Sequence, residues 1–236
     1  MSVALLLAVI AGGSLGIAFV IRPMTVSTGT WPGTLVYREG DNPWRSYAWL
    51  AASRKAPSGN STSYAASTPR ASEGTAPDVE GKSFSIQAQV TIPQDGADGM
   101  IITQGGLVGG WAFYLDNSRP VFHYNLDGID RYTIAADRTL APGPQTLLLA
   151  FNHDTKGAGE GGIATIVANG DQIARGRIEK TLATPFSFAE GLDIGGDTGT
   201  PVNLMYGLPF KFSGEIVNIT VNFGRPSSLE LGAPPH

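Results

Sequence analysis

Cysteine does not occur in this chain of 236 residues. Its absence excludes a cysteine nucleophile, a zinc site with cysteine ligands, an iron–sulfur cluster and any disulfide bond. Charged residues are also scarce, at 15% of the chain, and the net charge is -4. Because the longest basic cluster is the short string "SRK", no nucleic-acid partner is expected.

Apolar residues, glycine and proline are abundant. Hydrophobic residues make up 42% of the chain, which is enough for a sizeable core. The 31 glycines and 16 prolines together exceed their usual combined share of roughly 12%. This surplus is typical of a chain with many short strands joined by tight turns.

An uncharged run extends from Ser2 to Ile21, and Arg22 follows it. A run of this length can cross a bilayer as a helix. We therefore expect residues 1–22 to form a hydrophobic helix that anchors the chain in a membrane through residues 2–21, with the main domain periplasmic or extracellular. Two alternatives stay open. One is a signal peptide cleaved after "AGGS", although no basic residue follows Met1; the other is a buried helix or a misassigned start.

Three further segments are expected outside the main domain. Residues 23–52 are rich in aromatic side chains, and Trp44, Tyr47 and Trp49 fit either a membrane interface or packing against the body. Residues 53–80 are mostly small and polar without apolar periodicity, which predicts a flexible linker. Residues 226–236 are expected to form a disordered tail.

Strict alternation of apolar and polar residues begins after Lys82. In "SFSIQAQVTI" every second residue is apolar, and in "WAFYLDN" the same period places three bulky side chains on one face. A period of two indicates half-buried β-strands. The residues predicted to face the core in these two strands are Phe84, Ile86, Ala88, Val90 and Ile92, and then Trp111, Phe113 and Leu115.

Turn signals separate the predicted strands. Asn117-Ser118, Asp127-Gly128 and Asn169-Gly170 lie between alternating runs and predict hairpins. The string "GGLVGG" at residues 105–110 predicts a sharp bend between two strands, since glycine adopts backbone conformations closed to other residues. No helix is predicted after residue 82. Residues 81–225 are therefore expected to fold as an all-β, antiparallel, jelly-roll-like sandwich.

Four segments, the first beginning at Ser72, occur in an order known from one family. They are "SEGTAPDVEGKSFSIQAQVTIPQDGADGMIITQGGLVGGWAFYLDNSRPVFHYNLDGIDRYTI", "GRIEKT", "FSFAEGLDIGGDTGTPV" and "PFKFSGEIVNITVNF". In this order they resemble the C-terminal domain of large bacterial arylsulfatases, over about Ser72 to Phe223. The resemblance implies a concanavalin-A-like or laminin-G-like sandwich, which in that family follows the catalytic domain.

The chain departs from that family in its catalytic machinery. Arylsulfatases carry a C/S-x-P-x-R motif whose first residue is oxidised to formylglycine, together with acidic metal ligands. The nearest string here is "STPRA" from Ser67, in which Arg70 stands one place too early. We therefore assign no catalytic residue, and we do not expect the chain to be an enzyme on its own.

These observations predict a non-catalytic, arylsulfatase-type sandwich module, tethered to a membrane, that supports interaction or substrate contact for a sulfatase catalytic subunit. The alternative is a carbohydrate-binding module of jelly-roll type, with a glycan as its partner. A third interpretation, a glycan lyase or hydrolase, requires paired carboxylates on one sheet, and the predicted strands contain few acidic residues.

Four residues of the hairpin "YNLDGIDRYTI" are predicted to contact a ligand, because arginine binds oxyanions bidentately and tyrosine and asparagine accompany it here. They are Tyr124, Asn125, Arg131 and Tyr132. The alternative is a hairpin stabilised by an internal Asp–Arg pair that needs no ligand.

Asp193 and Asp197 are the candidate metal ligands, because two carboxylates in a glycine-rich loop suit Ca²⁺. The EF-hand pattern is not met, and the alternative is that both side chains cap turn amides. No other cofactor is expected.

The dipeptide His153-Asp154 follows a predicted strand and suggests a catalytic His–Asp pair. No serine nucleophile can be placed beside it from the sequence, so an exposed polar turn is the favoured interpretation. His123 lies between Phe122 and Tyr124 and is interpreted as a paired strand residue rather than a catalytic base.

Overall fold

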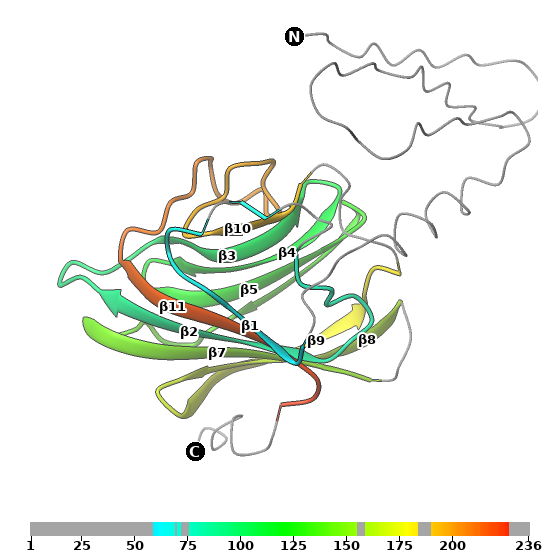
Figure 1. Ribbon diagram of the computed structural model, residues 1–236, viewed down its shortest axis with the longest axis horizontal. Coiled ribbons are helices and arrows are strands. Elements are labelled where there is room, and N and C mark those ends of the chain that lie inside the picture. The colour runs from blue at the N-terminus through cyan, green and yellow to red at the C-terminus, as the bar shows by residue number, and fades with distance from the viewer. Residues whose placement is uncertain (1–58, 69, 72–75, 155–158, 184–189, 227–236) are drawn as a thin grey trace, which may run out of the picture. The chain divides into compact units, whose positions relative to one another are not determined.

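The structure is a computed structural model, and it describes residues 59–68, 70–71, 76–154, 159–183 and 190–226 (Figure 1). The expected hydrophobic helix, the aromatic-rich segment and residues 227–236 of the expected tail lie outside these described residues. Within them, no helix is long and apolar enough to cross a membrane.

Across the described ranges the chain forms two antiparallel sheets and no helix (Figure 1), which confirms the predicted all-β sandwich. The six-stranded sheet has the order β1 (Ser61–Tyr64), β11 (Glu215–Phe223), β2 (Phe84–Ile92), β7 (Gly143–His153), β8 (Glu160–Ala168), β9 (Asp171–Lys180). The five-stranded sheet has the order β10 (Leu192–Ile194), β3 (Gly99–Gly106), β4 (Gly109–Asp116), β5 (Arg119–Leu126), β6 (Asp130–Ala135).

The core lies between the two sheets, where the alternating apolar residues of the strands meet. All of the residues predicted to face the core in β2 and β4 are buried. Trp111 of β4 contacts the six-stranded sheet, with its ring centroid 6.0 Å from that of Phe84. Phe84 in turn lies 5.7 Å from Phe151 of β7. Burial of these large rings is the main force that holds the sheets together.

The hairpins form at the predicted dipeptides. Asn117 and Ser118 join β4 to β5 with φ of 51° and 61°, and Asp116 pairs with Arg119. Asn169 and Gly170 join β8 to β9 with φ of 52° and 92°. Positive φ at both central residues is the geometry that matches the twist of paired strands.

One expectation needs correction. Residues 61–64 lie within the predicted linker but form β1, which pairs with Asn222–Ile219 of β11. The sharp bend predicted at "GGLVGG" is present between β3 and β4. Its turn consists of Leu107 and Val108, because β3 continues to Gly106 and β4 begins at Gly109, and the glycines belong to the paired strands.

A long loop, residues 195–213, covers the outer face of the five-stranded sheet; we call it the strap. Val202 of the strap packs in a small apolar cluster with outward-facing side chains of the sheet, with Tyr206 and Phe210 at its border. The sheet members of this cluster are Met100, Ala112, Tyr114 and Val121. The sandwich therefore has a second apolar layer outside the main core.

Candidate functional site

A row of side chains crosses the outer face of the five-stranded sheet beneath the strap. The strand register places Asp193, Thr103, Ala112, His123 and Thr133 side by side, one from each strand. Successive residues of a strand point to opposite faces, so these five side chains share one face. The row contains one histidine, His123, and one candidate metal ligand, Asp193.

His123 is almost completely enclosed, with 2% of its surface exposed. Its Nδ1 lies 2.8 Å from Thr133 Oγ1, so it is the paired strand residue that the sequence predicts. Its Nε2 has no hydrogen-bond partner among the described residues. Burial, with a smaller contribution from the charge of Arg131, lowers the pKa of His123 to about 4. The imidazole is therefore neutral at physiological pH.

The four predicted ligand contacts do not share a surface. Tyr124 and Tyr132 belong to the inner face and pack in or against the core, and the Tyr124 hydroxyl accepts a hydrogen bond from Leu182 N at 2.9 Å. Asn125 and Arg131 belong to the outer face. The period of two separates each tyrosine from its polar neighbour, which the sequence string alone does not reveal.

Asn125 and Arg131 hold local structure. The Asn125 amide donates to the carbonyl oxygens of Gly106 and Leu107, each at 2.9 Å, and its Oδ1 accepts from Gly128 N at 2.9 Å. These bonds join two neighbouring turns. Arg131 Nη1 donates to the carbonyl oxygen of Val202 at 2.7 Å, which fixes the strap to β6.

Both candidate metal ligands accept hydrogen bonds from the chain. Asp193 Oδ2 accepts from the backbone N and the hydroxyl of Thr198, at 2.9 and 2.8 Å. Asp197 accepts from Gly199 N at 3.3 Å and from the Tyr206 hydroxyl at 2.6 Å. Burial raises the pKa of Asp197. No group of three or more His, Cys, Asp or Glu side chains able to hold a metal ion occurs in the described ranges.

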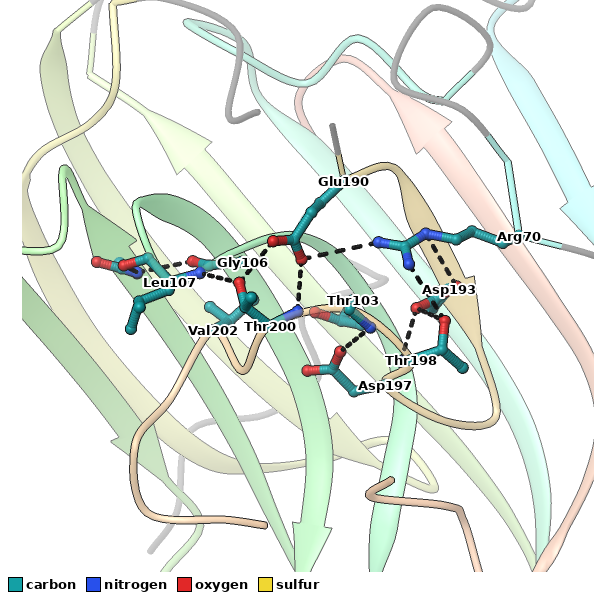
Figure 2. Close-up of polar contacts among 12 residues, drawn as sticks. Arg70, Thr103, Gly106, Leu107, Glu190, Asp193, Asp197, Thr198, Thr200 and Val202 are labelled. Atoms are coloured by element: carbon teal, nitrogen blue, oxygen red, sulfur yellow. Dashed lines mark hydrogen bonds and ion pairs between the residues drawn. The ribbon is translucent and has the colours of Figure 1, made fainter. Parts of the chain in front are cut away.

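A polar cluster beside β10 connects the strap to the N-terminal part of the domain. Figure 2 shows Arg70 directed at Glu190 and Asp193, and its nitrogens lie 3.7 and 3.6 Å from their carboxylates. Glu190 accepts from the Thr200 hydroxyl at 2.6 Å, and Thr200 Oγ1 accepts from Leu107 N at 2.8 Å. The cluster is internally paired, so it positions the strap and leaves little capacity for a ligand.

A hollow of about 670 Å³ lies at the edge of the six-stranded sheet, where β2 begins and β7 and β11 end. Such a volume falls within the range of small-molecule sites. Most of its lining surface is apolar, and the lining residues are Gly81, Lys82, Ser83, His153, Asp154, Gly224 and Arg225.

The charges of this hollow come from three strand ends. Asp154 binds Arg177 of β9 through two hydrogen bonds, the shorter of 2.6 Å, and this contact lowers the pKa of Asp154. Arg225 Nη2 donates to the carbonyl oxygen of His153 at 3.3 Å. Lys82 forms an ion pair with Asp78 at 2.8 Å. Each of the three charged side chains has a partner in the chain, and all three line this one opening.

The sequence analysis singled out His153 and Asp154 but missed Lys82 and Arg225. His153 is buried rather than part of an exposed turn, whereas Asp154 is exposed. Phe84 pairs with both Phe151 and Phe223, so the residues just before β2 and just after β7 and β11 meet at one edge. Only the strand order brings these distant residues together.

Comparison with known proteins finds solved structures that share the fold of this chain. No family model and no curated protein matches the chain. The CBM40 domain of the Ruminococcus gnavus IT-sialidase is 17% identical, with a TM-score of 0.50, and the alignment covers 72% of this chain and 90% of that chain. A mutant of the NanB sialidase from Streptococcus pneumoniae is 11% identical, with a TM-score of 0.52, covering 75% of this chain and 27% of that chain.

Mouse laminin α1 domains LG4–5 also align, at 13% identity and a TM-score of 0.44, over 70% of this chain and 40% of that chain. At such identities the likeness to the sialidase structures is one of fold alone. It agrees with the jelly-roll-like sandwich predicted from the sequence.

Proposed function

We propose that this chain is a non-catalytic, glycan-binding module, and that the hollow at the edge of the six-stranded sheet is its binding site. One observation carries the proposal: Lys82, Asp154 and Arg225 bring donors and an acceptor to a single opening of about 670 Å³. Sugar hydroxyls require both kinds of group, and a concave site with a few convergent polar side chains is typical of small-ligand binding.

The fold likeness supports the same class of function. The Ruminococcus gnavus domain with the shared fold is named as a carbohydrate-binding module of a sialidase. Fold alone does not assign a ligand. The residues of the hollow add a preference, because Lys82 and Arg225 are cationic and exposed at its rim. Arginine pairs well with carboxylate and sulfate-like oxyanions, so we expect acidic glycans to bind better than neutral ones.

The test is binding of the full chain to an array of neutral, sulfated and sialylated oligosaccharides, followed by calorimetry on the best probe. Arg225→Ala is expected to weaken binding by roughly tenfold, the usual cost of one lost charged hydrogen bond. Arg138→Ala is the matched control: Arg138 is likewise an exposed arginine with a partner in the chain, Asp171 at 3.2 Å, but it lies at the opposite end of the strands. Equal affinity for both variants, or no binding to any probe, would contradict the proposal.

A second candidate function rests on the sequence resemblance over about Ser72 to Phe223. In this proposal the module associates with a sulfatase catalytic subunit and supports its contact with substrate. The full chain alone is then expected to leave p-nitrophenyl sulfate unhydrolysed, while it forms a complex with a sulfatase catalytic domain that lacks its own C-terminal domain. Size-exclusion chromatography of the mixture measures this, and separate elution argues against it.

A further inference from the structure

The strap displays an uncharged apolar surface toward solvent. From Val202 to Phe210 it reads "VNLMYGLPF", without a charged residue. Met205 is 88% exposed, Leu204 64% and Leu208 41%. Single exposed apolar residues are ordinary, but three within five residues form a patch, and exposed patches mark sites of interaction.

The strap holds these side chains outward through fixed contacts. Asn203 Nδ2 donates to the Tyr114 hydroxyl at 2.9 Å, and Asn203 Oδ1 accepts from Met205 N at 3.1 Å. Tyr206 stacks on Phe210 with centroids 4.6 Å apart, and both rings meet Tyr114 edge-on. The backbone on either side of Leu204 and Met205 is therefore anchored to the sheet, while the two side chains point away from it.

A second exposed apolar group lies at the turns that end β3 and β5, and it has a different character. It contains Leu107, Val108 and Ile129, but Asp127 and Asp130 flank Ile129. Carboxylates are costly to bring into an apolar medium. Residues 202–210 of the strap contain no such group; the strap's own carboxylate, Asp197, is buried, and Lys211 is exposed with a long stem that can reach back to water. Of the two surfaces, the strap suits an apolar medium.

The N-terminal sequence indicates that this medium is a lipid bilayer. The uncharged run Ser2–Ile21 is expected to sit in a bilayer, and residues 22–58 connect it to the first described residue of the sandwich. A segment of this length reaches at most about 130 Å even when fully extended. A sandwich kept within that distance of a bilayer experiences a high effective concentration of lipid surface, so a weak contact suffices.

We propose that the strap docks on the surface of a lipid bilayer, with Leu204, Met205 and Leu208 entering the interfacial layer. This inference rests on the expected membrane anchor and is independent of glycan binding. Because residues 202–210, which hold the three exposed side chains, carry no charge, the contact is apolar and does not require anionic lipid. It would leave the hollow, on the other sheet, open to solvent.

The absence of cysteine makes a site-specific test straightforward. Met205→Cys in the full chain is labelled with a polarity-sensitive fluorophore and reconstituted into phosphatidylcholine vesicles that carry nitroxide lipids. Val217→Cys is the matched control, since Val217 is also apolar and 57% exposed but lies on β11 of the other sheet. We expect the label at 205 to shift to the blue and to be quenched several-fold more than the label at 217, with little change in 1 M salt.

A second variant tests whether the strap itself provides the contact. Leu204→Ser in the Met205→Cys background is expected to lower the quenching about several-fold, with unchanged thermal unfolding, because one buried leucine corresponds to roughly tenfold in partitioning. Equal quenching at 205 and 217 overturns the proposal. So does a blue shift that appears without lipid and grows with protein concentration, which would assign the patch to a second copy. Failure of the full chain to float with vesicles overturns the anchor and the strap contact together.

Discussion

His123, on the outer face of the five-stranded sheet, is expected to make the stability of the protein depend on pH. Its pKa is lowered to about 4, below its unfolded value of 6.5, so between these values the unfolded chain binds the proton and the native chain does not. The free energy of unfolding is therefore expected to fall as pH drops from 6.5 toward 4, by up to about 3 kcal/mol from this residue. His123→Asn, which keeps a polar atom near Thr133, is expected to remove this dependence.

Urea unfolding of the wild type and His123→Asn between pH 4 and 7 measures the difference. Asp197 has the opposite effect on the free energy of unfolding. Burial raises its pKa, so the native state binds a proton more readily than the unfolded chain, and this contribution grows as pH falls. Both chains contain Asp197, so its contribution cancels in the comparison. Parallel pH profiles for the two proteins would show that His123 does not carry the effect.

Tyr206 is a second residue with a defined energetic role. Its hydroxyl donates to Asp197 at 2.6 Å and accepts from Val202 N at 3.1 Å. Tyr206→Phe is expected to lower the free energy of unfolding by about 1–3 kcal/mol, because it leaves a buried carboxylate and a backbone amide short of partners. Tyr64→Phe is the control: the Tyr64 hydroxyl is buried with no hydrogen-bond partner in the described part of the chain, so its removal should cost nothing. Equal losses in chemical unfolding would contradict this assignment.

At the scale of elements, the end of the β3–β4 hairpin packs closely against the side chains of Glu190 and Thr200, at a position where only a glycine fits. A Cβ on Gly106 would collide with the side chains of Glu190 and Thr200, which tie the strap to β10. Gly106→Ala is therefore expected to destabilise the protein by about 1–3 kcal/mol. Gly207→Ala, where a Cβ meets no atom within 4 Å, should stay within about 0.5 kcal/mol of wild type. Thermal unfolding of both variants checks this, and identical melting temperatures would argue against the close packing.

Elements with strong local signals were predictable. The strands β2 and β4 follow from alternation, and the turns at Asn117-Ser118 and Asn169-Gly170 follow from residues that accept positive φ. The strand β1 was not predictable, because "STSY" has no apolar alternation and resembles the polar residues around it. Its pairing partner β11 supplies the hydrogen bonds, and that partner lies more than a hundred residues away in the chain.

At the scale of the whole sandwich, Trp111 connects the two sheets. It is fully buried, and its Nε1 has no hydrogen-bond partner among the described residues. Trp111→Ala is expected to cost about 3–5 kcal/mol through the cavity it leaves. Trp111→Phe should cost clearly less, since it keeps an aromatic ring beside Phe84 and removes an unpaired donor. Guanidinium unfolding followed by circular dichroism ranks the two, and the reverse order would contradict this account of the core.

Site residues were harder to predict than strands, for a reason that the hairpin at Tyr124–Tyr132 illustrates. The string gathers residues that suit ligand binding, yet the pleat places Tyr124 and Tyr132 inside and Asn125 and Arg131 outside. Conversely, Lys82 and Arg225 carry no local signal. They meet because β2 lies between β11 and β7, and strand order is a property of the whole chain.

By itself the sequence determined the class of fold, because alternation and turn residues act over a few neighbouring positions and leave a readable pattern. It also determined the lack of cysteine chemistry. Only the tertiary structure decided which charges share the hollow, which face the strap covers and which apolar side chains remain in solvent. Those outcomes depend on contacts between residues far apart in the chain, whose pairing no local period encodes.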